Sequence, residues 1–204
     1  VIGPVNEANF RVHTPNGTAI QDQHGHLRQL SYGPISASGT MAKYQKKYVA
    51  GTEVANSKYP KKSTASKLSW PYNFSFEKHF ELRKKGLEVR FIISGDNGMP
   101  FMLGYHPAFK LHTKNPIIIT NTEELSLQQI LAVGSRAFEV PNRNSITLKD
   151  EKTLTIETEG FGHFMCWTEV ENMVCIEPIT FYPYAVRQAD IHEGFKFLEG
   201  STHF

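Results

Sequence analysis

A regular alternation of apolar and polar residues between Pro71 and Ser94 constrains the fold of this 204-residue chain more than any other feature. Side chains that alternate in this way lie on opposite faces of extended strands, so that one face of the strand pair can be buried. The run Lys84–Gly86 interrupts the alternation with residues typical of a turn. The segment therefore predicts a β-hairpin. Lys78 interrupts the apolar face of its first strand, which predicts a bulge or an edge position there.

The rest of the chain extends the same pattern. Short apolar runs separated by turn residues predict further strands, and no helical period continues for more than two turns. Aromatic residues make up 12% of the chain, which suits strands because aromatic side chains pack well on a pleated surface. The sequence therefore predicts an all-β protein with a single domain over residues 1–204. The runs expected to be strands are Pro116–Thr120, Leu125–Val133, His163–Val170 and Asn172–Ile176.

Composition excludes several functional classes. A net charge of +2, with most basic residues scattered, is not typical of a nucleic-acid-binding protein. No apolar run approaches the ~20 residues that a membrane helix needs. No nucleotide, phosphate or metal motif is present, so we expect no cofactor and no metal. No signal peptide is visible in a chain that begins at Val1 without methionine, and we expect a cytoplasmic protein. The oligomeric state is not predicted.

The two cysteines, Cys166 and Cys175, fall in neighbouring predicted strands. We expect two buried free thiols, and a disulfide across the strand pair is the alternative.

A single imidazole lies in the apolar and aromatic stretch Met99–Phe109. His106 is followed by Pro107, which has no N–H for a β-ladder and restricts His106 to extended geometry. His106 is therefore expected at a strand end, where its ring can face a pocket. A structural histidine in a loop is the alternative.

Two further segments place polar side chains where strand patterning favours apolar ones. In Gln23–Arg28 and at Asp22 just before it, the even spacing of Asp22, His24, His26 and Arg28 predicts one face of an extended strand. Two imidazoles at this spacing are compatible with a metal site, but a structural or substrate-binding role is preferred because no third ligand is evident. In Cys175–Pro178, Glu177 ends an apolar strand, so it is expected at the rim or paired with a partner such as Arg28.

Together these segments resemble the aldose 1-epimerases, the galactose mutarotase-like family, and in particular its shorter bacterial branch. The resemblance rests on Gly104–Phe109, on Gln23–Gly25 with Arg28, and on Trp167 followed by Cys175–Pro178. It implies an antiparallel β-supersandwich with a sugar site on the concave face of one sheet. It also implies that the family's first strands precede Val1 and that its last strand follows Phe204.

The family's reaction interconverts the α and β anomers of a free hexose by opening and reclosing the ring. The resemblance implies that Glu177 is the base that takes the proton of the C1 hydroxyl. His106 would be the acid that protonates the ring oxygen, with the two groups on opposite sides of C1 and O5. The partner is then a monosaccharide. Residues expected to bind it are His24, Arg28, Tyr105 and Trp167.

One expected feature has no clear counterpart. Galactose mutarotases use a further acidic residue to hold the sugar, and Glu139 is a poor match for it. Three other functions are therefore considered: epimerisation of a hexose 6-phosphate with Lys110 or Arg187 near the phosphate, a non-catalytic carbohydrate-binding protein, and a purely structural β-sandwich.

Overall fold

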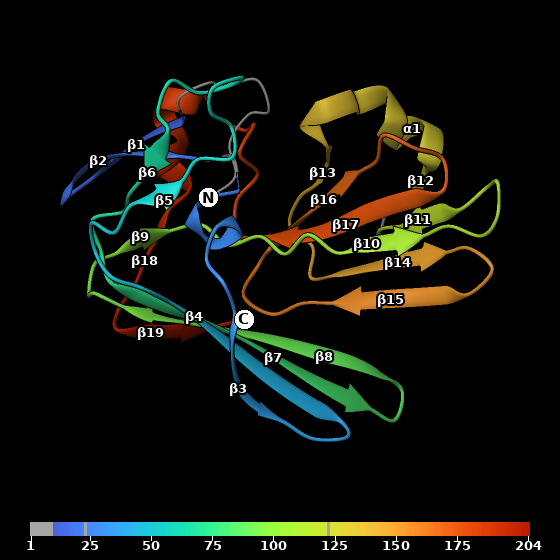
Figure 1. Ribbon diagram of the computed structural model, residues 1–204. Coiled ribbons are helices and arrows are strands. Elements are labelled where there is room, and N and C mark those ends of the chain that lie inside the picture. Colours follow the sequence, from blue (N-terminus) through green and yellow to red (C-terminus); the bar gives the residue numbers. More distant parts are fainter. Residues whose placement is uncertain (1–9, 23, 122) are drawn as a thin grey trace. The chain divides into compact units, whose positions relative to one another are not determined.

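The computed structural model describes residues 10–204 except Gln23 and residue 122 (Figure 1). The described chain forms two compact units. The first contains the described residues up to Phe101 together with Arg187–Phe204, and the second contains Met102–Val186. The expectation of a single domain over residues 1–204 stays a prediction. Within the described residues, no helix has both the length and the apolar character needed to cross a membrane.

The first unit is built on a five-stranded antiparallel sheet with the strand order β19-β8-β7-β4-β3. Three two-stranded ribbons pair β1 with β2, β5 with β6, and β9 with β18. The sheet strands are β3 (Gly33–Ala37), β4 (Met41–Tyr48), β7 (Phe74–Arg83), β8 (Gly86–Gly95) and β19 (Ser201–His203). The ribbon strands are β1 (Phe10–Thr14), β2 (Gly17–Gln21), β5 (Val54–Ala55), β6 (Lys67–Leu68), β9 (Pro100–Phe101) and β18 (Lys196–Phe197). Two 3₁₀ segments are η1 (His26–Arg28) and η3 (Gln188–Gly194).

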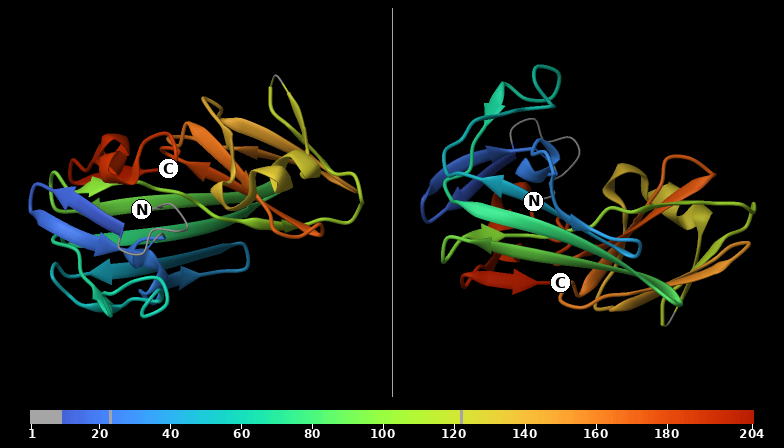
Figure 2. Two further views of the ribbon diagram at one scale, coloured as in Figure 1. Left: turned by 90° about the horizontal axis from the view of Figure 1, so that it is seen from above. Right: turned by 60° about the horizontal axis from the view of Figure 1, so that its bottom comes forward.

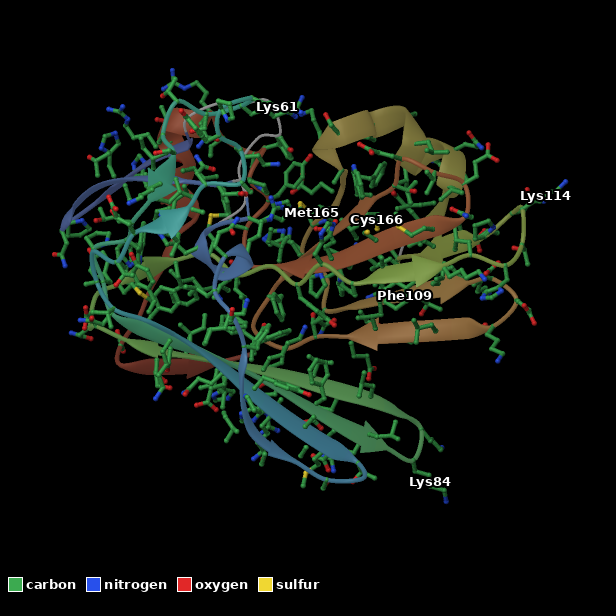
Figure 3. The ribbon with its side chains drawn as sticks, viewed as in Figure 1. Lys61, Lys84, Phe109, Lys114, Met165 and Cys166 are labelled. Atoms are coloured by element: carbon green, nitrogen blue, oxygen red, sulfur yellow. The ribbon has the colours of Figure 1, made fainter. Side chains whose placement is uncertain are left out.

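The predicted hairpin is confirmed as β7 and β8, which run side by side in Figure 2. Lys84 lies at the tip of this hairpin (Figure 3). The predicted bulge or edge position at Lys78 is wrong, because Lys78 pairs regularly with Tyr44 on one side and Phe91 on the other. Its ammonium lies 5.0 Å from the centre of the Phe80 ring. A lysine can occupy an apolar face in this way because its alkyl stem packs on the rings and its charge faces an aromatic surface.

The second unit contains two four-stranded antiparallel sheets and one short helix (Figures 1 and 2). The first sheet has the order β10-β17-β16-β13, and the second has the order β12-β11-β14-β15. The strands of the first sheet are β10 (Ala108–Lys110), β13 (Phe138–Val140), β16 (His163–Trp167) and β17 (Met173–Ile179). Those of the second are β11 (Ile117–Ile119), β12 (Glu124–Ser126), β14 (Ser145–Lys149) and β15 (Thr153–Glu157). The helix α1 (Leu127–Val133) is followed by the 3₁₀ turn η2 (Gly134–Arg136).

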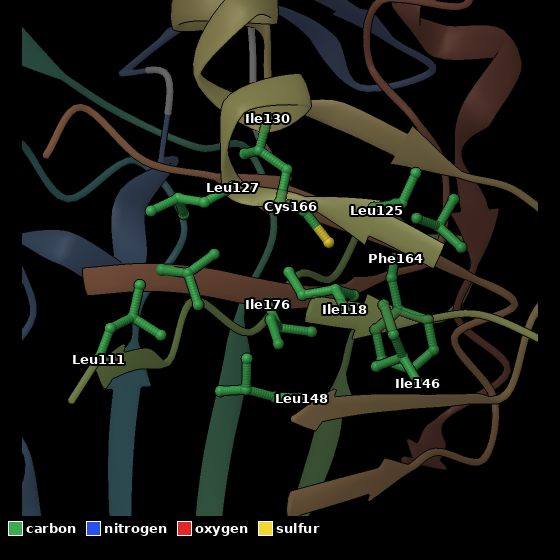
Figure 4. Close-up of a cluster of buried hydrophobic side chains, with 12 residues drawn as sticks. Leu111, Ile118, Leu125, Leu127, Ile130, Ile146, Leu148, Phe164, Cys166 and Ile176 are labelled. Atoms are coloured by element: carbon green, nitrogen blue, oxygen red, sulfur yellow. The ribbon is translucent and has the colours of Figure 1, made fainter. Parts of the chain in front are cut away.

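A cluster of buried apolar side chains holds the second unit together (Figure 4). It takes Phe164 and Ile176 from the first sheet, Ile118 and Ile146 from the second, and Ile130 from α1. All five are at most 2% exposed. Antiparallel strands with one apolar face need such a partner layer, and the two sheets and α1 supply it to each other. The all-β, antiparallel fold predicted from the sequence is confirmed.

The run Leu125–Val133 was expected to be a strand, and this prediction is wrong for residues 127–133. They form α1, whose start is stabilised by a capping box: the Gln129 backbone N–H donates to Ser126 Oγ, and the Gln129 side chain accepts from the Ser126 N–H. The buried residues Leu127 and Ile130 are three positions apart, which places them on one helix face. The pattern Ser-x-x-Gln before an apolar run is a helix-start signature that could have identified α1.

Replacing Ser126 with Ala is expected to lower the free energy of unfolding by about 1 kcal/mol, because one N-terminal backbone N–H of α1 loses its acceptor. Urea titration followed by tryptophan fluorescence measures the change. Ser135→Ala, at an exposed position just beyond the helix, is the control and is expected to cost less. Equal stability of Ser126→Ala and the wild type would contradict the role of the cap.

Candidate active site

The register of β10 and β17 places His106 opposite Glu177. Ala108, the first residue of β10, pairs with Cys175. The same antiparallel register extends back along the chain, before β10 begins, to an isolated bridge between Gly104 and Ile179. Between these pairs, the Tyr105 N–H donates to the Pro178 carbonyl over 3.0 Å. Because Pro107 and Pro178 have no N–H, the regular ladder stops here. His106 therefore lies just before β10, as expected from the sequence.

Residues directly opposite each other in an antiparallel pair project to the same face, so their side chains can meet. His106 Nε2 and Glu177 Oε1 are 2.7 Å apart, an ion pair and a hydrogen bond in one contact. The Glu177 side chain is 6% exposed, whereas that of His106 is 41% exposed. A buried carboxylate is thus paired with an imidazole that solvent and small molecules can reach.

Cys175 completes a cluster with this pair. One imidazole nitrogen of His106, the Cys175 sulfur and a carboxylate oxygen of Glu177 all lie within 4.8 Å of one another. The pKa of His106 is raised from 6.5 to about 10, first by its hydrogen bond with Cys175 and then by the hydrogen bond and charge of Glu177, while burial opposes the shift. His106 is therefore a cation at neutral pH.

Trp167 lies beside this cluster. It pairs with Cys175 in the register of β16 and β17, and its ring centre is 6.0 Å from that of His106, with the two planes inclined by 52°. The structure thus brings together three of the six predicted site residues: His106, Glu177 and Trp167. The fourth in this unit, Tyr105, is half-buried and adjacent in sequence, but strand alternation directs it away from the face that carries His106.

The opposite face of the same sheet belongs to the core. Cys166 pairs with Ile176 while Cys175 pairs with Trp167, so the two cysteines alternate to opposite faces. Cys166 joins the apolar cluster of Figure 4, whereas Cys175 lies beside His106 and Glu177. Both thiols are free and buried, as expected, and this alternation explains why they do not form the alternative disulfide.

The register also fixes the position of Glu139, which by sequence is a poor match for the family's further acidic residue. Glu139 pairs with Met165, and Met165 pairs with Glu177, so the two carboxylates share a face at a separation of two strands, about 10 Å. Glu139 is half-buried. No local motif identifies it, because its position depends on the pairing of β13 with β16.

The remaining two predicted residues, His24 and Arg28, lie in the first unit. The expected strand over Gln23–Arg28 is wrong: β2 ends at Gln21, and His26–Arg28 form the 3₁₀ turn η1, while Gln23 lies outside the described residues. Because His24 and His26 lie in a turn, their two imidazole rings do not share one face of a strand. His26 is buried and shares a hydrogen bond of 2.7 Å with Gln21, so it is a core residue.

The buried carboxylate of Asp22 organises this turn. It accepts hydrogen bonds from the His24 backbone N–H at 2.8 Å, the Ser57 hydroxyl at 2.6 Å and Arg28 Nη1 at 3.1 Å. Arg28 also contacts the His24 ring. Burial by itself raises the pKa of Asp22, but the hydrogen bonds with His24 and Ser57 and the charge of Arg28 outweigh it, and the pKa is well below its ordinary 3.8. Asp22 thus holds His24 and Arg28 in fixed orientations.

Asp22→Asn is expected to reduce the free energy of unfolding by about 2–3 kcal/mol at neutral pH, since an amide replaces a charged acceptor of several hydrogen bonds. A depressed pKa contributes stability above the unfolded value and loses it below. The difference between variant and wild type should therefore shrink as pH falls below 3.8. Urea unfolding at neutral and acid pH measures it.

The matched control is Asp190→Asn, which breaks an ion pair with Arg187, whose side chain is 84% exposed. Exposed pairs contribute at most about 1 kcal/mol. A loss at Asp22 no larger than at Asp190 would contradict the organising role of Asp22.

Comparison with known proteins shows the family of this chain. The family model described as aldose 1-epimerase matches residues 13–163, and the chain belongs to this family, whose reaction is a sugar isomerisation. The matched region contains His24, Arg28, Tyr105 and His106 but ends before Trp167 and Glu177. The role of Glu177 therefore stays a prediction from the family resemblance, and the structure adds its contact with His106.

Solved structures share the fold. A galactose mutarotase-like protein from Lactobacillus casei has a TM-score of 0.71 at 16% identity, over 100% of this chain and 79% of that one. A galactose mutarotase related enzyme from Lactobacillus acidophilus has a TM-score of 0.68 at 18% identity, over 100% and 77%. A galactose mutarotase-like protein from Clostridium acetobutylicum has a TM-score of 0.63 at 16% identity, over 100% and 75%. The search of curated proteins found no match.

Proposed function

We propose that this protein is an aldose 1-epimerase that interconverts the α and β anomers of a free hexose, with Glu177 as base and His106 as acid. The observation that carries the proposal is the direct contact of 2.7 Å between the buried carboxylate and the accessible imidazole. An ion pair that only stabilises the fold would not require that small molecules can reach one of its two side chains. A cytoplasmic location, expected from the sequence, is part of this proposal.

The contact suits a reaction at one carbon atom. The C1 hydroxyl oxygen and the ring oxygen O5 of a hexose are both bonded to C1, so two groups that touch each other can reach one oxygen each. A sugar that enters replaces the hydrogen bond between His106 and Glu177 with two new ones. Glu177 then takes the hydroxyl proton while His106 protonates O5, and the C1–O5 bond breaks. Rotation about C1–C2 and the reverse transfers close the ring on the other face.

The two proton transfers assist each other. In the free protein the hydrogen bonds with Cys175 and Glu177, together with the charge of Glu177, raise the pKa of His106. When Glu177 accepts the hydroxyl proton it loses its charge, so its contribution to that raised pKa disappears. His106 becomes a stronger acid at the moment when O5 needs a proton.

Two further residues of the same sheet face have parts in this proposal. Trp167 offers an apolar ring face beside His106, against which the C–H face of a sugar can pack. Glu139, on the same sheet face, would accept hydrogen bonds from sugar hydroxyls distant from C1. The roles of His24, Arg28 and Tyr105 in holding hydroxyls stay predictions from the family resemblance.

Polarimetry on freshly dissolved α-D-glucose and α-D-galactose tests the proposal. The protein is expected to speed the approach to the equilibrium rotation of at least one of them, relative to buffer alone. No acceleration with either sugar or with glucose 6-phosphate would contradict an epimerase, and binding without acceleration would instead support a non-catalytic carbohydrate-binding protein.

Epimerisation of a hexose 6-phosphate is a second candidate, favoured by the place of Lys110. This exposed lysine pairs with Met173 and lies four residues beyond His106 on the same face, about 13 Å along the strand. Arg187, the other basic residue considered, is engaged with Asp190. If the substrate is phosphorylated, Lys110→Ala should raise KM for glucose 6-phosphate and leave KM for glucose unchanged.

A further inference from the structure

The residues around the proposed acid–base pair include a third group that acid–base chemistry does not require. Cys175 is 3% exposed, and its sulfur lies in the same cluster as the His106 ring and the Glu177 carboxylate, with all three donor atoms within 4.8 Å of one another. The Cys175 thiol also lies 3.6 Å from the Met173 thioether sulfur. The cluster therefore combines a nitrogen, an oxygen and sulfur in one small volume.

This set of donors is characteristic of zinc. Zn²⁺ is bound by thiolate, imidazole and carboxylate at about 2.0–2.3 Å, and sites with three protein ligands keep a fourth position open for water. Soft sulfur ligands favour Zn²⁺ and related cations over Mg²⁺ and Ca²⁺, which prefer oxygen. The two anionic ligands, Cys175 and Glu177, balance the charge of a divalent cation.

The geometry needs only a small adjustment. Tetrahedral bonds of about 2.0–2.3 Å separate neighbouring ligand atoms by roughly 3–4 Å. The 2.7 Å contact between His106 and Glu177 has to open slightly, and the His106 side chain is 41% exposed and can turn. The pairing of β10, β17 and β16 already places Cys175 and Glu177 on one sheet face, and donor atoms that lie within 4.8 Å of one another need to approach by at most about 1–2 Å.

We propose that His106, Cys175 and Glu177 form a site for a zinc-like divalent cation, and that the bound cation inhibits the enzyme. It occupies the two side chains that would move protons, so it is an inhibitor and not a cofactor. Metal binding stands independently of the proposed function, and only the inhibition rests on it.

Cobalt(II) tests the site directly, because a cobalt–thiolate bond gives a charge-transfer absorption band that other ligands do not. The purified, chelator-treated protein is titrated with Co²⁺ at mildly alkaline pH, where protons compete less for the ligands. We expect the thiolate band to saturate at one equivalent and Zn²⁺ to abolish it by displacement.

Two cysteine variants make a matched pair. Cys175→Ala should lose the band and bind Co²⁺ more than about 100-fold more weakly, since even outer-shell changes cost 10–100-fold. Cys166→Ala, on the opposite face of the same strand pair, should keep the band and the affinity. Circular dichroism checks that both variants are folded, and His106→Asn should weaken binding without removing the band.

Absence of the band from the wild type, or equal affinity of the two cysteine variants, would overturn the site. Polarimetry with Zn²⁺, corrected for mutarotation by the ion alone, then tests inhibition: the wild type and Cys166→Ala should be inhibited at the Zn²⁺ concentration that displaces cobalt. Full activity of the zinc-bound protein would overturn inhibition. If the metal-free protein accelerates no sugar, the proposed function fails while the cobalt spectrum still decides the site.

Discussion

Replacing Glu177 with Gln is expected to slow mutarotation by about 10²–10⁴-fold, the range typical of the loss of one general acid or base. The amide has the shape of the carboxylate but cannot accept the proton of the C1 hydroxyl. The direct contact with His106 also loses its charge, although an amide oxygen can still accept the hydrogen bond. Initial rates of optical rotation, with the preferred sugar at concentrations below KM, measure the effect.

The sugar should still bind to Glu177→Gln, and isothermal titration calorimetry would give a Kd within about 10-fold of the wild type, since the amide oxygen keeps a neutral hydrogen bond and only the charge-dependent part, roughly 1 kcal/mol, is lost. Glu157→Gln is the matched control: it makes the same change at an exposed position of β15 and should leave the rate unchanged. A Glu177→Gln variant that turns over at the wild-type rate would refute the assignment of the base.

His106→Asn is expected to cause a comparable loss of rate, because Asn offers a hydrogen bond but no transferable proton at neutral pH. The double variant with Glu177→Gln should be little slower than either single variant, since the two groups act as a unit. Polarimetry on the three variants tests this, and fully multiplicative losses would contradict a coupled pair.

The pH profile gives a second readout of the same contact. The pKa of His106 is raised to about 10 by Cys175 and Glu177, so the acid form persists well above the ordinary histidine value of 6.5. The pH dependence of kcat/KM reports the groups of the free enzyme. We expect activity to be retained through neutral pH and to fall as pH rises through about 10. An alkaline limb near pH 6.5 would contradict the pairing.

The raised pKa has a consequence for stability as well. A group whose pKa is higher in the folded state contributes stability below its unfolded pKa and loses that contribution as pH rises through the folded value. The wild type should therefore lose stability relative to His106→Asn between pH 6.5 and about 10. Urea midpoints across this range measure the difference, and parallel curves for the two proteins would contradict the ion pair.

Properties of residues close together in the chain were sufficient to predict several features of the fold. The alternation between Pro71 and Ser94 predicted β7 and β8, because a period of two positions matches the geometry of a strand. Pro107 predicted that His106 lies at a strand end, since a proline has no N–H for the ladder. These conclusions needed only near neighbours in the chain.

Other predictions failed where side-chain contacts, only some of them distant in sequence, decided the structure. The even spacing of His24, His26 and Arg28 suggested a strand, but the hydrogen bonds of Asp22 with His24, Arg28 and Ser57 hold a compact turn instead. Lys78 looked like an irregularity, yet aromatic rings on the sheet face accommodate it. In α1, by contrast, the capping signature was present in the sequence and was overlooked.

The sequence by itself determined the class of fold and the kinds of side chain available, because hydrophobic period and proline geometry are local properties. Only the tertiary structure decided which of those side chains meet. His106 and Glu177 are 71 positions apart, and their contact follows from the register of β10 with β17, which is set by packing of the opposite face into the core. The same register directs Cys175 toward His106 and Glu177 and directs Cys166 away from them. A shift of one residue would have exchanged the two faces and buried the site residues in the core.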